Sequence, residues 1–85
     1  MLRLDLKDNY GTVLFTDPEK GVMIRKDVTE VKGETKYELW IETTSSFGMC
    51  YATYDSEEER NTAYDYVVHK IKEYLFSKGC LCKEV

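Results

Sequence analysis

The sequence predicts a small α+β domain in which a five-stranded, antiparallel, twisted sheet precedes one C-terminal helix packed across it. Two observations predict this fold. Short β-rich runs separated by turn residues fill the chain up to residue 54, and one amphipathic segment with marked ends follows them. A chain of 85 residues can bury one core, so we expect a single α+β domain over residues 1–79 and a short C-terminal tail over residues 80–85.

The strands are identified by alternation and by the turns between them. We expect them at residues 2–7, 12–16, 22–31, 36–44 and 49–54. Leu2, Leu4 and Leu6 alternate with charged residues, which is typical of a strand with one buried face. Residues 17–21, Asp-Pro-Glu-Lys-Gly, favour a turn because proline presets φ and glycine tolerates positive φ.

Alternation in the last two strands divides their side chains between the two faces of the sheet. The face toward the helix is expected to carry Tyr37, Leu39, Ile41, Cys50, Ala52 and Tyr54. Trp40, Met49 and Tyr51 then lie on the opposite face, which is normally polar in an uncovered antiparallel sheet. Two interpretations follow. Either the first two strands curl over this face to form a barrel interior, or the face binds a protein, because Trp, Tyr and Met anchor interfaces.

The helix is predicted from Ser56 to about Lys78. Ser56 and Glu59 form a capping box, and Gly79 stands where a left-handed C-terminal cap is expected. Residues at helical spacing make one stripe wide enough to cover a sheet. The stripe consists of Ala63, Tyr64, Val67, Val68, Ile71, Tyr74 and Leu75.

A second line of side chains on this helix is predicted to face away from the sheet. Thr62, Tyr66, His69, Glu73 and Phe76 follow 4-3-4-3 spacing, so two aromatic rings and the histidine share an otherwise solvated face. This line could dock a protein partner or a second copy in a homodimer. The alternative is that the aromatics are scattered exposed residues and that Phe76 packs on the C-terminal tail.

Composition excludes several classes of function. The chain has 12 Lys and Arg against 16 Asp and Glu, a net charge of −4, which argues against direct binding of nucleic acid. No apolar run approaches the roughly 18 residues of a membrane span, and the first residues lack a signal-peptide pattern, so we expect no membrane contact and a cytoplasmic location. Three cysteines, an odd number, indicate reduced thiols rather than a disulfide framework.

The chain carries no recognisable catalytic motif, and we expect it not to be an enzyme. It has one histidine, no glycine-rich phosphate loop and no serine nucleophile elbow. A protein without a cofactor is expected, but Cys80 and Cys82, with His69 and Cys50, would supply a set of ligands suited to structural zinc. A small zinc protein is therefore the alternative function, although the one-residue spacing of the paired cysteines is unusually short and ordinary thiols on a frayed tail are the simpler explanation.

The acidic run Asp55-Ser56-Glu57-Glu58-Glu59 could imitate the phosphates of nucleic acid and occupy a basic groove on another protein, or it could be only a well-capped helix start. With this run, Trp40, seven tyrosines and its small size, the chain resembles the phage-encoded inhibitors of host nucleases, the anti-CRISPR class among them. The resemblance implies a non-enzymatic inhibitor or adaptor whose partner is a basic nucleic-acid-binding protein such as a CRISPR nuclease. The expected contact residues are Trp40, Met49, Tyr51, Tyr66, His69 and Phe76, with Asp55, Glu57, Glu58 and Glu59 as steering charges.

Overall fold

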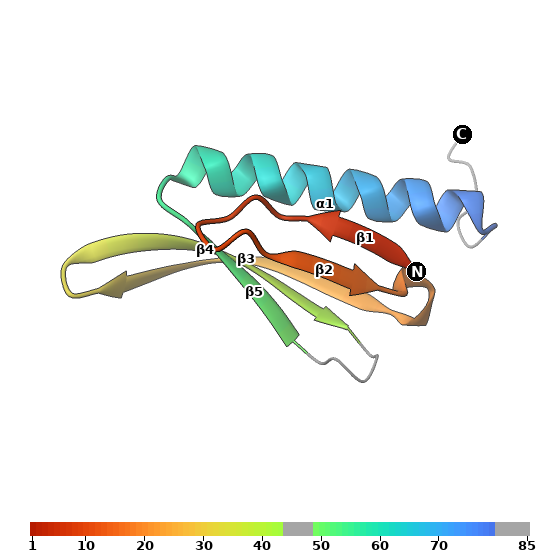
Figure 1. Ribbon diagram of the computed structural model, residues 1–85, viewed down its shortest axis with the longest axis horizontal. Coiled ribbons are helices and arrows are strands. Elements are labelled where there is room, and N and C mark those ends of the chain that lie inside the picture. Colours follow the sequence, from red (N-terminus) through yellow and green to blue (C-terminus); the bar gives the residue numbers. More distant parts are fainter. Residues whose placement is uncertain (44–48, 80–85) are drawn as a thin grey trace.

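Two antiparallel sheets and one helix surround a common core in the computed structural model, which describes residues 1–43 and 49–79 (Figure 1). The first sheet pairs β1 (Leu2–Asp5) with β2 (Val13–Thr16). The second has the order β3 (Val22–Val31), β4 (Glu34–Thr43) and β5 (Met49–Tyr54). A short 3-10 helix, η1 (Pro18–Lys20), links the two sheets, and helix α1 (Glu57–Ser77) follows β5. No helix in the described ranges is long and apolar enough to cross a membrane.

The predicted α+β fold with one C-terminal helix is confirmed, but the prediction of a single five-stranded sheet is wrong. Main-chain groups of the two sheets are joined at a corner, where the Asn9 N–H donates to the Thr53 carbonyl at 3.1 Å and the Thr53 N–H donates to the Asp8 carboxylate at 3.4 Å. The physical reason lies in the connection between β1 and β2. Lys7, which follows the end of β1, takes a φ of 49° and turns the chain out of the strand direction. The Thr53 N–H then donates to the Asp8 carboxylate rather than to a strand carbonyl, so no ladder of strand hydrogen bonds continues from one sheet to the other.

The β3–β4 hairpin is regular over its full length. Its register runs without interruption from Val22 opposite Thr43 to Val31 opposite Glu34. Lys32 and Gly33, with φ of 52° and 80°, form the two-residue turn, since positive φ at both central residues is the geometry that matches the twist of the strands. The tip of this hairpin projects beyond the start of α1 (Figure 1).

The core lies between α1 and the predicted inner faces of the strands. The side chains of Leu39, Ile41, Ala52 and Tyr54 are buried, as their alternation predicted, and Tyr37 and Cys50 pack partly buried against them. The other buried apolar residues come from α1 and from the first strand and its end, and they are Ala63, Val67, Ile71, Leu4 and Leu6. The hydrophobic effect over this single cluster therefore holds both sheets and the helix together.

Arg60, which was not part of the predicted stripe, belongs to the buried face of α1. Its side chain is only 6% exposed. The Arg60 Nη1 donates to the carbonyl of Asp27 at 2.9 Å, and the Arg60 Nε donates to Asn61 Oδ1 at 2.9 Å. The guanidinium carbon of Arg60 lies 5.6 Å from the centre of the Tyr37 ring. Arg60 thus fastens the first turn of the helix to β3.

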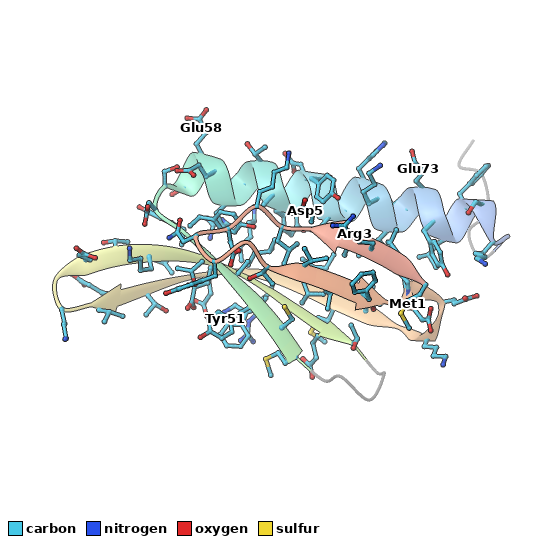
Figure 2. All side chains as sticks on the ribbon, in the orientation of Figure 1. Met1, Arg3, Asp5, Tyr51, Glu58 and Glu73 are labelled. Carbon is cyan, nitrogen blue, oxygen red and sulfur yellow. The ribbon has the colours of Figure 1, made fainter. Side chains whose placement is uncertain are left out.

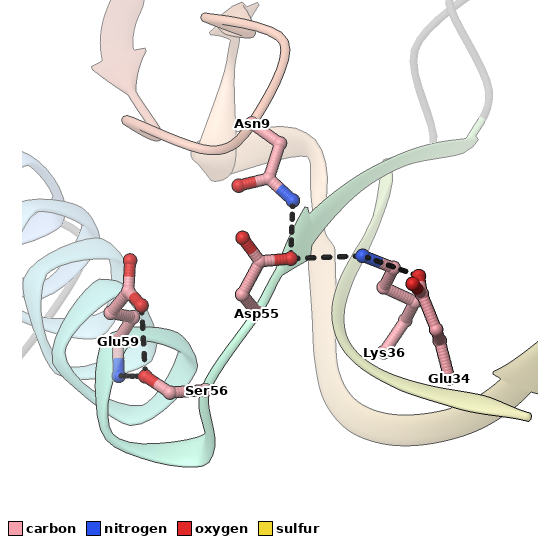
Figure 3. Close-up of polar contacts among 6 residues, drawn as sticks. All are labelled: Asn9, Glu34, Lys36, Asp55, Ser56 and Glu59. Carbon is pink, nitrogen blue, oxygen red and sulfur yellow. Dashed lines mark hydrogen bonds and ion pairs between the residues drawn. The ribbon is translucent and has the colours of Figure 1, made fainter.

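Both predicted ends of the helix are confirmed. Ser56 Oγ accepts a hydrogen bond from the Glu59 N–H at 3.1 Å and donates to Glu59 Oε1 at 2.9 Å (Figure 3). Gly79 has a φ of 74°, the left-handed conformation expected beyond the last turn.

Candidate functional site

The face of the second sheet that points away from α1 carries large apolar side chains. The register places Trp40 directly between Arg25 and Tyr51, and Met23 and Met49 flank the neighbouring position on β4. Met23, Met49 and Tyr51 are 61%, 54% and 52% exposed. We call this surface the outer face and define it by Met23, Arg25, Glu38, Trp40, Glu42, Met49 and Tyr51.

The β1–β2 hairpin does not cover the outer face. Leu4 and Leu6 of this hairpin lie in the core with the helix residues, on the other side of β4. The barrel-interior interpretation of Trp40, Met49 and Tyr51 is therefore wrong, because Met49 and Tyr51 remain more than half exposed.

Trp40 is held in a defined orientation at the centre of the outer face. Its ring stacks on Tyr51 with centroids 4.8 Å apart and planes 23° from parallel, and the guanidinium carbon of Arg25 lies 5.2 Å from the centre of the indole. The indole N–H donates to Glu38 Oε1 at 3.1 Å, and the same oxygen accepts from Thr29 Oγ1 at 3.0 Å. Stacking, cation–π contact and a hydrogen bond together fix a side chain that is only half-buried.

A shallow notch lies beside Trp40. It is lined by Met23, Arg25, Trp40, Glu42 and Met49. The register places Glu42 directly between the two methionines. Its exposed carboxylate has no hydrogen bond or ion pair with any of the described residues. Thioether and indole walls around a free acceptor suit a side chain with an apolar stem and a cationic end.

The outward-facing positions of this sheet are acidic on balance. Their carboxylates belong to Asp27, Glu34, Glu38 and Glu42, and their cations to Arg25 and Lys36. Lys36 is already occupied, because its Nζ lies 2.9 Å from Asp55 and 3.6 Å from Glu34 (Figure 3). The free charge of the surface is therefore mainly negative.

The predicted acidic run divides into structural and free carboxylates. Asp55 Oδ1 accepts from Lys36 Nζ and from Asn9 Nδ2, and these hydrogen bonds lower the pKa of Asp55 while the Asp55 contact raises the pKa of Lys36. Glu59 is engaged with Ser56 in the helix cap. Glu57 and Glu58 are exposed at the start of α1, so they are the members of the run with free charge to offer.

The predicted outward line on α1 is not continuous. His69 is exposed and its Nε2 lies 3.4 Å from Glu73, and Phe76 is 54% exposed. Tyr66 instead turns toward β1, packs partly buried against the core and accepts a hydrogen bond from the Asp5 N–H at 3.3 Å. The structure therefore leaves His69 and Phe76 on the exposed side of the helix and places Tyr66 on its flank.

The predicted zinc ligands are not brought together among the described residues. Cys50 faces the core, where burial raises the pKa of its thiol, whereas His69 is on the exposed side of α1. Cys80 and Cys82 lie outside the described residues. Over residues 1–43 and 49–79, no group of three His, Cys, Asp or Glu side chains could hold a metal ion.

Comparison of the chain with protein-family models, curated proteins and solved structures finds no match. Sequence reasoning missed Met23 and Arg25, which lie opposite Glu42 and Trp40. The signal that could have found them is the Lys32–Gly33 pair, because a two-residue turn at that point fixes the register along β3 and β4.

Proposed function

We propose that the chain is a non-enzymatic protein-binding module, an inhibitor or adaptor, whose contact surface is the outer face. The observation that carries the proposal is the half-buried Trp40 stacked on the exposed Tyr51 and flanked by the exposed side chains of Met23 and Met49. Aromatic residues and Met are enriched in interfaces, and Trp and Tyr are among the residues that dominate their binding energy.

Preorganisation supports this role for Trp40. A side chain that is already fixed by Tyr51, Arg25 and Glu38 loses little conformational entropy when a partner covers it. Burial of its apolar surface by a partner then contributes more to the binding free energy than burial of a freely rotating side chain would. This favours a contact made by rigid docking onto the sheet.

The charge of the module favours a basic protein as the partner. Glu42 stands free beside the apolar centre, and Glu57 and Glu58 add exposed negative charge at the start of α1. Complementary charge accelerates encounter and selects against acidic partners. A nucleic-acid-binding protein has such a basic surface, whereas nucleic acid itself would be repelled by the net charge of −4.

The proposal is tested by affinity capture from the native host with wild-type protein, Trp40→Ala and Tyr10→Ala. Tyr10 is 82% exposed and lies in the β1–β2 connection, so it controls for loss of an exposed aromatic group. We expect a host protein retained by wild type and Tyr10→Ala but lost from Trp40→Ala, with the helical circular dichroism signal unchanged. Equal retention by Trp40→Ala, or unfolding of that variant, would remove the outer face from the proposal.

A further inference from the structure

A larger concavity, separate from the outer face, lies between β1 and the first half of α1. It is a groove of about 910 Å³. Its floor contains the side chains of Leu6, Tyr54 and Ala63, which are 1%, 2% and 8% exposed. Asp5 and Tyr66 line opposite walls, and Figure 2 shows Asp5 between β1 and the helix. The groove therefore combines an apolar floor with one wall that is a strand and one that is a helix.

The strand wall has main-chain groups that no strand pairs. The Leu6 N–H donates to the Thr12 carbonyl at 3.0 Å in the same register that sets Leu4 opposite Leu14. Along a strand, the main-chain N–H and C=O groups of successive residues point to opposite edges. The groups of Leu4 and Leu6 therefore point toward β2, and the groups of Arg3 and Asp5 point toward α1. The bond from the Asp5 N–H to the Tyr66 hydroxyl confirms this direction. A phenol oxygen thus occupies the place where a neighbouring strand would present a carbonyl.

The rim of the groove favours a cationic ligand. Asp5, Glu58 and Glu59 line it against Lys7 and Lys70. The ammonium of Lys70 is 3.8 Å from Glu73, outside the groove. The carboxylates of Asp5 and Glu58 have no ion pair with any residue that the structure describes. Lys7 is likewise without an ion pair among the described residues, so two free carboxylates face one free ammonium group and the balance in the groove is negative.

We propose that this groove binds an extended peptide segment that adds to the open edge of β1. Strand addition beside a helix takes its affinity from main-chain hydrogen bonds and its specificity from alternate side chains. The segment places an apolar side chain on the floor formed by Leu6 and Ala63. Its next residue points to the side of Asp5 and is lysine or arginine, because directly opposed strand residues share a face of the sheet. The Tyr66 hydroxyl yields its position on the Asp5 N–H to a carbonyl of the peptide.

The test uses the isotope-labelled protein and the probe peptide acetyl-Thr-Leu-Lys-Leu-Thr-amide, followed by NMR. We expect the amide signals of Arg3, Asp5 and Ala63 to shift progressively with peptide concentration. A peptide methylated on the amide nitrogens of its three central residues binds at least about tenfold more weakly, since it cannot donate to the strand edge. No shift at these three amides up to the solubility limit, or equal binding of the methylated peptide, would overturn the proposal.

Variants separate the groove from the outer face. Glu58→Lys is expected to weaken binding of the lysine peptide and to strengthen binding of the same peptide with glutamate in place of lysine, while Tyr66→Phe leaves binding equal or stronger because it frees the Asp5 N–H. Trp40→Ala should change the affinity for neither the lysine peptide nor the glutamate peptide, because Trp40 does not line the groove. A probe that shifts only the Trp40 indole signal would contradict the groove and leave the outer face intact. Loss of binding in Tyr66→Phe would contradict strand addition.

Discussion

Trp40 lies against Tyr51, with ring centroids 4.8 Å apart, on the side of β4 and β5 opposite the core. Tyr51→Ala should leave the fold intact and release the indole. Because Tyr51 is half exposed, we expect the free energy of unfolding to fall by no more than about 1.5 kcal/mol. The single tryptophan should become easier to quench with acrylamide. A larger loss of stability in urea denaturation would mean that the ring pair belongs to a core.

Arg60 tests how far the helix depends on its link to β3. Arg60→Ala removes the hydrogen bond to the Asp27 carbonyl and the contact with the Tyr37 ring, both made by a buried side chain. We expect a loss of about 2–3 kcal/mol in urea denaturation. Arg3→Ala, at an exposed position, is the matched control and should change stability by less than about 0.5 kcal/mol. Equal effects of the two substitutions would show that the link to β3 is not structural.

Asp8 makes the corner between the sheets sensitive to acid. Partial burial acts to raise the pKa of its carboxyl group, but hydrogen bonds from Thr12, Thr53 and Tyr10 together lower the pKa below its ordinary value. A group with a lowered pKa in the folded state stabilises the fold above the unfolded-state pKa of about 3.9, and this contribution is lost as the pH falls through the folded-state pKa.

Asp8→Asn should therefore destabilise the protein at pH 7, by about 1–3 kcal/mol, and much less at pH 2. The measurement is urea denaturation across this pH range. A difference between variant and wild type that stays constant with pH would refute the assignment of the effect to the carboxylate.

Gly33 sets the register that builds the outer face. Its φ of 80° is a conformation that residues with a side chain rarely adopt, and no atom lies within 4 Å of the position where a Cβ would stand. Gly33→Ala should therefore cost about 1–2 kcal/mol of stability through backbone strain alone. Gly33→Asn should recover much of the loss, because asparagine tolerates this conformation. If asparagine and alanine destabilise equally, the turn is not what limits the hairpin.

The sequence predicted elements that depend on local chemistry. Alternation placed Leu39 and Ile41 on the inner face and Trp40 on the outer face, and Ser56 and Gly79 marked the helix ends. Local patterns contain this information because strand parity and helix caps involve only nearby residues.

Three features could not be predicted because they arise from tertiary contacts. The split into two sheets depends on Asp8 meeting Thr53, 45 residues away. Arg60 is buried because it finds the Asp27 carbonyl, and Tyr66 turns to β1 because its hydroxyl finds the Asp5 N–H. Helical spacing fixes the angle of a residue around the axis, but a long polar side chain follows its partner.

The proposed function requires that a second protein covers the outer face. The most direct measurement is photo-cross-linking in host extract from benzoylphenylalanine at position 49, which is more than half exposed beside Trp40, with the same group at position 76 on the helix as control. We expect a discrete protein adduct from position 49 that disappears when Trp40→Ala is added, and none from position 76. An adduct only from position 76, or from neither position, would contradict it.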